Sequence, residues 1–345
     1  MSEVLPGHLK EKDMFAIGRH VSRLSGYAPA VPTPFDADDD IDAAAFERFC
    51  DRLIAEGATA LVVCGTTGEA PTLTVPEHRK LIRIAVEVAH GRVPVIAGAG
   101  SNATSHAIDL SKDAEAAGAD AILSVVPYYN KPVQAGIEAH FRAIAGSTGL
   151  SMILYDVPSR TIAGLADQTV ARLAELPQVI GLKDATGDPA RPMRLRPLVG
   201  TDFRLLSGDD ITAFAFMAQG GDGCISVTSN VVPGLCRAVF LQCRQGSLPR
   251  AQRLSIPVAR LTTALSRETN PAPLKYALSR LGMMPARVRL PLVEPTAQTK
   301  DEIEAALASV HDCYGDYVIG AASGFGDGMQ AIETKPLTGS AAQNI

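Results

Sequence analysis

The sequence predicts an α/β fold, and three features of its apolar residues support this class. From Tyr27 onward, short runs rich in Val, Ile and Leu alternate with longer, Ala-rich amphipathic stretches. The short runs lack a strict alternation of polar and apolar residues, as is typical of parallel strands buried on both faces. The amphipathic stretches between them provide the crossover helices that parallel strands require.

Eight strand–helix units of this kind lie between residues 27 and 246. Two architectures accommodate them, an open doubly wound sheet and a closed barrel, and the count of eight favours the barrel. No GxGxxG motif opens the first unit, and Gly98-Ala-Gly100 is only a fragment of one, which removes the main support for a dinucleotide-binding sheet. We therefore predict a (β/α)8 TIM barrel with a C-terminal helical appendix.

The predicted strands are short and apolar, and the first of them ends where Pro32 and Pro34 interrupt the pattern. The strands, in chain order, are Tyr27–Val31, Ala60–Val63, Val93–Ala97, Ala121–Val125, Ser151–Tyr155, Val179–Leu182, Phe203–Leu206 and Gly223–Ser226.

The helices between the strands show apolar residues at helical spacing. The first has aspartates at its start, which suit the positive end of the helix dipole, and the second is opened by Thr74 and Pro76. A helix is also expected after the sixth and seventh strands, but the pattern gives it no bounds. The delimited helices are Ile41–Glu56, Val75–His90, Ala103–Ala116, Gln134–Ala145, Asp167–Leu176 and Val231–Arg244.

Beyond Gly246 the pattern is purely helical, with predicted helices over Ala251–Ser266, Pro273–Leu281 and Lys300–His311. The tail that follows is rich in glycine and then polar, so we expect it to be extended or disordered, with a subunit contact as the alternative. The predicted parts of the chain are an N-terminal extension (1–26), the barrel (27–246), the C-terminal helices (247–311) and the tail (312–345).

Composition and charge exclude several classes of function. Of the 345 residues 46% are hydrophobic, which rules out a wholly disordered chain. The net charge is -5 and the 32 Lys and Arg residues are scattered, so the basic patch that nucleic acid requires is missing. No uninterrupted apolar run is long enough to predict a membrane span.

The N-terminal region carries charges and no apolar segment, and the six cysteines lack CxxC or other metal-type spacing. We therefore expect a cytoplasmic protein with reduced thiols and no secretory signal. No HxxxH or carboxylate–histidine cluster lies at a strand end, so no metal site is predicted. The usual phosphate loop after the last two strands is also missing, which disfavours a phosphorylated substrate.

The chemistry of such a barrel is expected where the strands end, because its active sites form from the loops there. Lys183 directly follows the apolar run Val179–Leu182. One interpretation is a lysine that reaches solvent or pairs with Asp184, and the other is a nucleophilic amine. Attack on a ketone requires the neutral amine, so the second interpretation needs burial to lower the lysine pKa and needs Asp184 to point away.

Tyr155 and Arg160 follow the fifth strand. Tyr155 is either part of the core edge or, beside an amine, a proton relay, because its hydroxyl both donates and accepts hydrogen bonds. Arg160 is either a solvated loop charge or a carboxylate clamp on a proline-stiffened loop, since guanidinium binds carboxylate through two parallel hydrogen bonds.

Two further loops carry candidate residues. Gly65-Thr-Thr-Gly-Glu69 follows the second strand and forms either a plain βα turn or a turn whose backbone N–H groups cradle a small anion. Pro127-Tyr-Tyr-Asn130 places two adjacent tyrosines after the fourth strand, which indicates an interface or a ligand contact.

These loops together resemble the pyruvate-dependent class I aldolases, the family that includes dihydrodipicolinate synthase and N-acetylneuraminate lyase, and they are most similar to the synthases within it. The likeness covers about residues 27–308 in the order of the family, and the set of motifs is specific although each one alone is weak. The further matching segments are Tyr155–Thr161, Gly181–Gly187, Ser207–Asp210, Ile225–Asn230 and Asn270–Lys275.

The resemblance implies a role for each matching residue. Lys183 would form the Schiff base with pyruvate, and Tyr155 would relay protons during imine and enamine formation. Thr66 and Thr67 would hold the pyruvate carboxylate, largely through backbone N–H groups. Thr66 would also link Tyr155 to Tyr129, which would reach into the site of a neighbouring subunit.

The resemblance also implies an acceptor and an assembly. Arg160 would bind the carboxylate of L-aspartate semialdehyde, and Gly208 and Ile225 would line the site through their backbones. The product, hydroxytetrahydrodipicolinate, would feed lysine and diaminopimelate biosynthesis. No cofactor or metal is implied beyond the covalent lysine imine, and the family is usually a homotetramer built as a dimer of dimers.

Two other functions stay open at this point. A sibling enzyme, such as a hydratase-aldolase or a dehydratase, would act on another pyruvate-derived keto acid. The Thr66–Thr67 pair and the arginine after Val-Pro-Ser favour the synthase over it. From a different class, an inactive barrel would bind a keto acid as a sensor or scaffold, but such a protein is expected to have lost the lysine or the tyrosine, and both are present.

One departure from the family concerns feedback inhibition. Inhibited bacterial members bind lysine at a dimer interface through a histidine and a glutamate, and the corresponding positions here are Val75 and His106. His78, Asn102 and Tyr128 do match. Because the missing glutamate would partner the lysine ammonium, we expect weak or absent inhibition by lysine.

Overall fold

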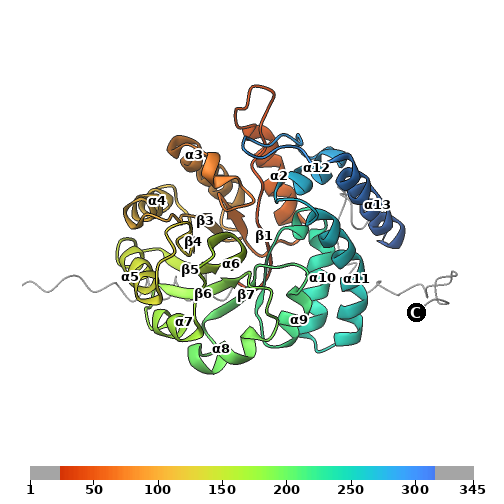
Figure 1. Ribbon diagram of the computed structural model, residues 1–345. Helices are drawn as coiled ribbons and strands as arrows, with labels where there is room; N and C mark the ends of the chain where they lie inside the picture. The colour runs from red at the N-terminus through yellow and green to blue at the C-terminus, as the bar shows by residue number, and fades with distance from the viewer. Residues whose placement is uncertain (1–23, 315–345) are drawn as a thin grey trace, which may run out of the picture.

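The computed structural model describes residues 24–314, in which eight parallel strands form one sheet in the order β1-β8-β7-β6-β5-β4-β3-β2. The sheet closes on itself, because Ala30 bridges Val62 and the Val31 N–H donates to the Val62 carbonyl at 2.8 Å. Figure 1 shows the helices arranged around this barrel. The predicted (β/α)8 TIM barrel is confirmed. Expectations for residues 1–23 and 315–345 lie outside the described residues.

The strands lie within two residues of their predicted ends. The most useful difference is in β6, which continues two residues past Leu182 and so includes both Lys183 and Asp184. The strands are β1 (Gly26–Pro29), β2 (Leu61–Val63), β3 (Val95–Gly98), β4 (Ala121–Val125), β5 (Ser151–Asp156), β6 (Val179–Asp184), β7 (Arg204–Ser207) and β8 (Gly223–Ser226).

The helices that the sequence delimits are all present. The second shows why its start was predictable, since the Thr74 side chain accepts from the Glu77 N–H while the Glu77 carboxylate accepts from the Thr74 N–H. These helices are α2 (Ala43–Ala55), α3 (Val75–Ala89), α4 (Thr104–Ala116), α5 (Gln134–Ala145), α7 (Asp167–Ala174) and α10 (Pro233–Arg244).

Three short helices had no predicted bounds. In α8 (Arg191–Val199) the two prolines Pro192 and Pro197 obscure the helical pattern, and α9 (Ala213–Ala218) is too short to show one. The segment after β5 was expected to be a loop, but it forms the single-turn helix α6 (Pro158–Thr161), whose first residue is a proline. Short 3₁₀ turns, η1 (Ala70–Thr72) and η2 (Thr228–Asn230), follow β2 and β8.

The C-terminal helices form the predicted appendix. They are α11 (Leu248–Leu265), α12 (Ala272–Arg280) and α13 (Ala297–Tyr314), and the last is longer at both ends than the predicted Lys300–His311. Helix α11 packs against α10 of the barrel and against α13. No helix among residues 24–314 has the length and apolar character that crossing a membrane requires.

Two apolar clusters make up the core. The larger one lies between the strands and the surrounding helices and includes Phe46, Leu81 and Phe141. The smaller one is formed mainly by strand residues such as Ile96 and Ile153, and it also contains Tyr155 and Ile225. Two of the predicted site residues are therefore fixed by packing within the strands.

Candidate active site

Lys183 and Tyr155 lie side by side at the carboxyl ends of β6 and β5, where they are register partners. The Lys183 Nζ is 4.2 Å from the centroid of the Tyr155 ring. Both side chains are held out of solvent, with Lys183 only 6% exposed. The sequence placed both residues at strand ends, and parallel pairing of the strands brings the amine next to the aromatic ring.

Gly208 and Ile225 adjoin this pair. A Cβ on Gly208 would come within 2.9 Å of the Lys183 Cε, so the glycine leaves the space that the lysine chain occupies. The Gly208 N–H also donates to the Asp184 carbonyl at 2.6 Å, which ties the end of β7 to that of β6. Ile225 is buried in the strand cluster that contains Tyr155.

Behind the lysine and the tyrosine lies a buried charge cluster. Asp156 and Asp184 are also register partners, one residue beyond the lysine–tyrosine pair. The Arg191 guanidinium is 2.6 Å from the Asp156 carboxylate and 3.4 Å from that of Asp184. Asp184 thus points away from Lys183, as predicted. Sequence reasoning missed Arg191, because an arginine before a proline resembles an ordinary helix start.

The ionisation of this cluster is set by burial and by mutual attraction. Burial raises the pKa of Asp156, and the contact with Arg191 opposes this without cancelling it. Burial acts to lower the pKa of Arg191, but Asp184 and Asp156 outweigh it, so that pKa is raised. The Arg191 guanidinium therefore stays charged beside these carboxylates.

The Gly65–Glu69 loop turns back on itself directly after β2. The Glu69 N–H donates to the Thr66 carbonyl at 3.1 Å, and the Thr67 hydroxyl accepts a hydrogen bond from the Asn270 amide at 2.9 Å. Within residues 24–314 the backbone N–H groups of Thr66 and Thr67 donate no hydrogen bond. The turn therefore offers two amides to an anion, in keeping with the predicted cradle.

Arg160 lies exposed on α6. It forms a hydrogen bond with Asn270, the residue that also donates to Thr67. Its guanidinium donates to the Asn270 carbonyl at 3.4 Å. Asn270 therefore contacts both candidate carboxylate-binding elements, Arg160 and Thr67. The sequence offered no signal for this connection, because Asn270 precedes α12, more than 100 positions from either residue.

Tyr129 lies in the loop between β4 and α5. Its side chain is 88% exposed and its φ of 72° is in the left-handed region. Within the described chain no hydrogen bond joins Tyr129 to Thr66 or Tyr155, so the expected link between the three residues is not made inside one subunit.

At the positions that the family resemblance links to lysine binding, Val75 is the exposed first residue of α3 and His78 is buried one turn later. The His78 ring pairs through Nε2 with the Gly98 carbonyl at 2.7 Å, and burial lowers the pKa of His78. Among residues 24–314 no group of His, Cys, Asp or Glu side chains is arranged to hold a metal ion.

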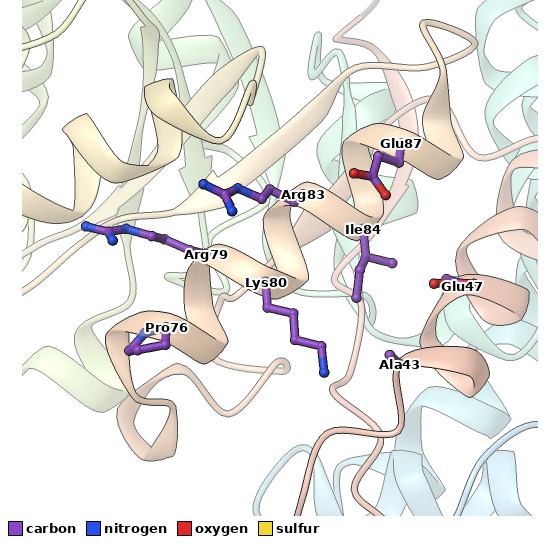
Figure 2. Close-up of a pocket in the computed structure, with 8 residues that line it drawn as sticks. All are labelled: Ala43, Glu47, Pro76, Arg79, Lys80, Arg83, Ile84 and Glu87. Carbon is purple, nitrogen blue, oxygen red and sulfur yellow. The ribbon is translucent and has the colours of Figure 1, made fainter.

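A separate groove lies on the outside of the barrel, between α2 and α3 (Figure 2). Lys80, Ile84 and Glu87 of α3 line it together with Ala43 and Glu47 of α2. None of the predicted site residues contributes to it. The groove carries both signs of charge.

The buried lysine at a strand end, its tyrosine neighbour and the threonine turn with unpaired amides define a class of protein, a class I aldolase-type lyase on a (β/α)8 barrel. A family model described as the dihydrodipicolinate synthetase family matches residues 23–310, and the chain belongs to that family.

Several similar proteins are named as synthases. The 4-hydroxy-tetrahydrodipicolinate synthase of Gluconobacter oxydans is 48% identical over 289 residues, which is 84% of this chain and 97% of that protein. The synthase of Rhodospirillum centenum is 50% identical over 282 residues, 82% of this chain and 97% of its own length. A solved structure of the Acinetobacter baumannii dihydrodipicolinate synthase complexed with pyruvate has a TM-score of 0.81 at 40% identity, covering 83% of this chain and 98% of that one.

Proposed function

We propose that the chain condenses pyruvate with L-aspartate 4-semialdehyde to 4-hydroxy-tetrahydrodipicolinate, in lysine and diaminopimelate biosynthesis. The observation that carries the proposal is the buried Lys183 amine at 4.2 Å from the Tyr155 ring, at a strand end of the barrel. The family and the names of the relatives support the same reaction. No cofactor is needed, because the lysine imine itself acts as the electron sink.

The chemistry begins with a carbon–nitrogen bond. The Lys183 amine attacks the ketone carbon of pyruvate, and the carbonyl oxygen leaves as water to give an imine. Loss of a methyl proton converts the imine into an enamine, whose carbon attacks the aldehyde of the second substrate. The amino group of that substrate then attacks the imine carbon and releases Lys183 with the cyclic product. Tyr155 would carry the protons that these steps exchange.

The two carboxylates need separate partners. The N–H groups of Thr66 and Thr67 would hold that of pyruvate, and Thr67 is kept in place by the Asn270 amide at 2.9 Å. Arg160 would hold the carboxylate of the semialdehyde, for which its exposed guanidinium is suited. Gly208 and Ile225 would shape the space around the imine.

The test compares acceptors. Initial rates are measured with pyruvate plus L-aspartate semialdehyde, and with other aldehydes alongside. A kcat/KM far higher for the semialdehyde is expected. Borohydride trapping of pyruvate on Lys183, without turnover of the semialdehyde, would keep the Schiff-base chemistry and assign the chain to a sibling reaction on another keto acid. Failure to trap pyruvate at all would contradict the proposal.

The assembly is part of the same proposal. We infer that the subunits associate, as a homotetramer built from dimers, so that the exposed Tyr129 side chain enters the site of a neighbour. Analytical ultracentrifugation of the full chain measures the mass. A monomer with full activity, or a Tyr129→Phe variant with unchanged kcat, would contradict this role of the tyrosine.

Two smaller proposals follow. We expect little inhibition by lysine, because His106, at the position of the glutamate, offers no negative charge to an ammonium group, and near-complete inhibition at low-millimolar lysine would contradict this. We also place the enzyme in the cytoplasm, on the five free cysteines among the described residues. Cell fractionation tests the location.

A further inference from the structure

A second buried ion pair underlies the Gly65–Glu69 loop, and the mechanism above makes no use of it. The side chains of Glu69 and Lys275 are both 0% exposed, and the Lys275 Nζ is 2.8 Å from the Glu69 Oε1. The same ammonium donates to the Thr33 carbonyl at 2.8 Å. Lys275 belongs to α12, so this pair joins the C-terminal appendix to the second strand–helix loop of the barrel.

Glu69 is held in an unfavourable backbone conformation. Its φ is +56°, in the left-handed region that costs a residue with a side chain free energy. Such a conformation persists where the surroundings fix it. Here they do, since the second carboxylate oxygen of Glu69 accepts the Arg289 N–H at 2.9 Å. Both oxygens of one carboxylate are thus occupied by residues of the C-terminal region.

The neighbouring contacts act on the same turn. The Thr33 hydroxyl donates to the Gly68 carbonyl at 2.7 Å, and the Asn270 amide donates to the Thr67 hydroxyl at 2.9 Å. The Phe35 ring lies 4.3 Å from the Lys275 Nζ, measured to the ring centroid. Three consecutive residues of the turn, Thr67, Gly68 and Glu69, are therefore each held by a hydrogen bond from another part of the chain.

A buried ion pair of this kind is a weak source of stability, because removing two charges from water costs about as much as their attraction returns. An apolar pair would hold α12 on the barrel equally well. The directional hydrogen bonds to Glu69, by contrast, set the orientation of the peptide groups that precede it, and these include the N–H groups of Thr66 and Thr67.

We propose that Glu69 and Lys275 are positioning residues for the carboxylate of pyruvate. Through them the C-terminal appendix fixes the two amides that receive the substrate, without touching the substrate itself. This inference rests on the proposed function for the identity of the anion.

The experiment measures the pyruvate concentration that gives half-maximal borohydride trapping on Lys183, together with KM and kcat. The single variants are Glu69→Gln and Lys275→Met, and the double variant Glu69→Gln/Lys275→Met removes both charges. Because no unpaired charge stays buried in the double variant, it is expected to unfold at nearly the same urea concentration as the wild type.

In all three variants the half-saturating pyruvate concentration and KM are expected to rise about ten- to hundredfold, while kcat changes less than about threefold. The matched control is Arg196→Met. Arg196 pairs with Asp222 at 2.8 Å and donates to the Phe203 carbonyl, at the segments that enter β7 and β8, the opposite end of the barrel. It is expected to lower stability and leave KM unchanged.

The double variant decides the question even where a single variant fails to fold. A stable double variant with wild-type half-saturation would overturn the inference and leave the pair a structural link only. Absence of trapping in the wild type would overturn the proposed function, and this inference with it. If pyruvate is trapped on the wild type, and the variants reach half-maximal trapping at the same pyruvate concentration as the wild type, this inference is overturned and the proposed function stands.

Discussion

Two sides of the barrel mouth are built in different ways. On the β5–β6 side, the carboxylate of Asp156 meets its partner Arg191 35 positions along the chain. On the β2 side, Glu69 meets Lys275 206 positions away. The first arrangement needs only neighbouring strand–helix units, whereas the second exists only when the appendix has packed onto the barrel.

The two clusters also differ in charge. Arg191 faces three carboxylates, the buried ones of Asp156 and Asp184 and the partly exposed one of Asp167, whereas Glu69 and Lys275 face each other one to one. The difference suggests a division of tasks. In the proposed reaction, the β5–β6 side would hold the groups that make and break bonds, and the β2 side would hold the groups that orient the substrate.

The largest effect is expected on the bond-making side, at Lys183. Lys183→Ala removes the amine, so turnover is expected to fall by more than about a thousandfold, and borohydride should trap no pyruvate. The fold should persist, because the side chain contributes no ion pair to the core of the described residues. Initial rates, trapping followed by mass spectrometry, and circular dichroism measure these outcomes. Wild-type activity in this variant would rule out the Schiff base.

The next effect concerns the charge cluster behind the lysine. Arg191→Met leaves Asp156 and Asp184 buried without a counter-charge, so stability is expected to fall by about 3–5 kcal/mol near pH 7. The pKa of Asp156 is already raised by burial, and loss of the guanidinium raises it further. A raised folded-state pKa means that the folded protein takes up protons as the pH falls. The variant should therefore recover part of its stability as the pH falls from 7 toward the ordinary aspartate value near 3.8.

Urea unfolding across this pH range checks the second prediction, and Arg194→Met is its control. Arg194 lies in the same helix and pairs with Asp167 and Asp188, but its side chain is 50% exposed. Exposed pairs contribute about 0–1 kcal/mol, so this variant should stay close to the wild type. An equal loss in both variants would show that burial of the cluster has no special weight.

The same contrast explains how much the sequence could predict. The barrel, its eight strands and the lysine and tyrosine at two strand ends follow from periodicity and from local position. The orientation of Asp184 follows too, because successive residues of a strand point to opposite sides. The residues at the strand ends also gave the threonine turn and Arg160 as candidates, and the family likeness added Gly208 and Ile225.

What the sequence could not supply are the long-range contacts. Nothing near Glu69 indicates that its carboxylate pairs with Lys275, and nothing near Thr67 points to Asn270. Periodicity reports on one element at a time, whereas these hydrogen bonds depend on how the appendix docks on the barrel. The helix α8 was also obscured locally, since two prolines interrupt its pattern.

The smallest effect is expected on the β2 side, at the salt bridge between Arg289 and Glu77, whose nitrogen and oxygen are 2.5 Å apart. The hydrogen bond from Arg289 is the main reason that the pKa of Glu77 is lowered to about 2. A lowered folded-state pKa contributes stability that is present above the unfolded value near 4.5 and is lost as the pH falls toward 2. Glu77→Gln should therefore cost about 1–2 kcal/mol at pH 7, after allowance for solvent screening.

Urea unfolding of this variant at pH 7 and pH 3 tests both the size and the sign of that contribution. The difference from the wild type should shrink by about half or more at pH 3, because unfolded chains then hold the proton that the folded wild type still lacks. Glu294→Gln is the control, since its side chain is 62% exposed and its ion-pair partner among the described residues is Lys300, and a change below about 0.5 kcal/mol is expected. If the loss of stability in Glu77→Gln stays constant with pH, the shape of the Glu77 side chain, and not its charge, holds Arg289 in place. In that case the C-terminal appendix would be held to the β2 side by the buried Glu69–Lys275 pair, and the charge of Glu77 on α3 would contribute nothing.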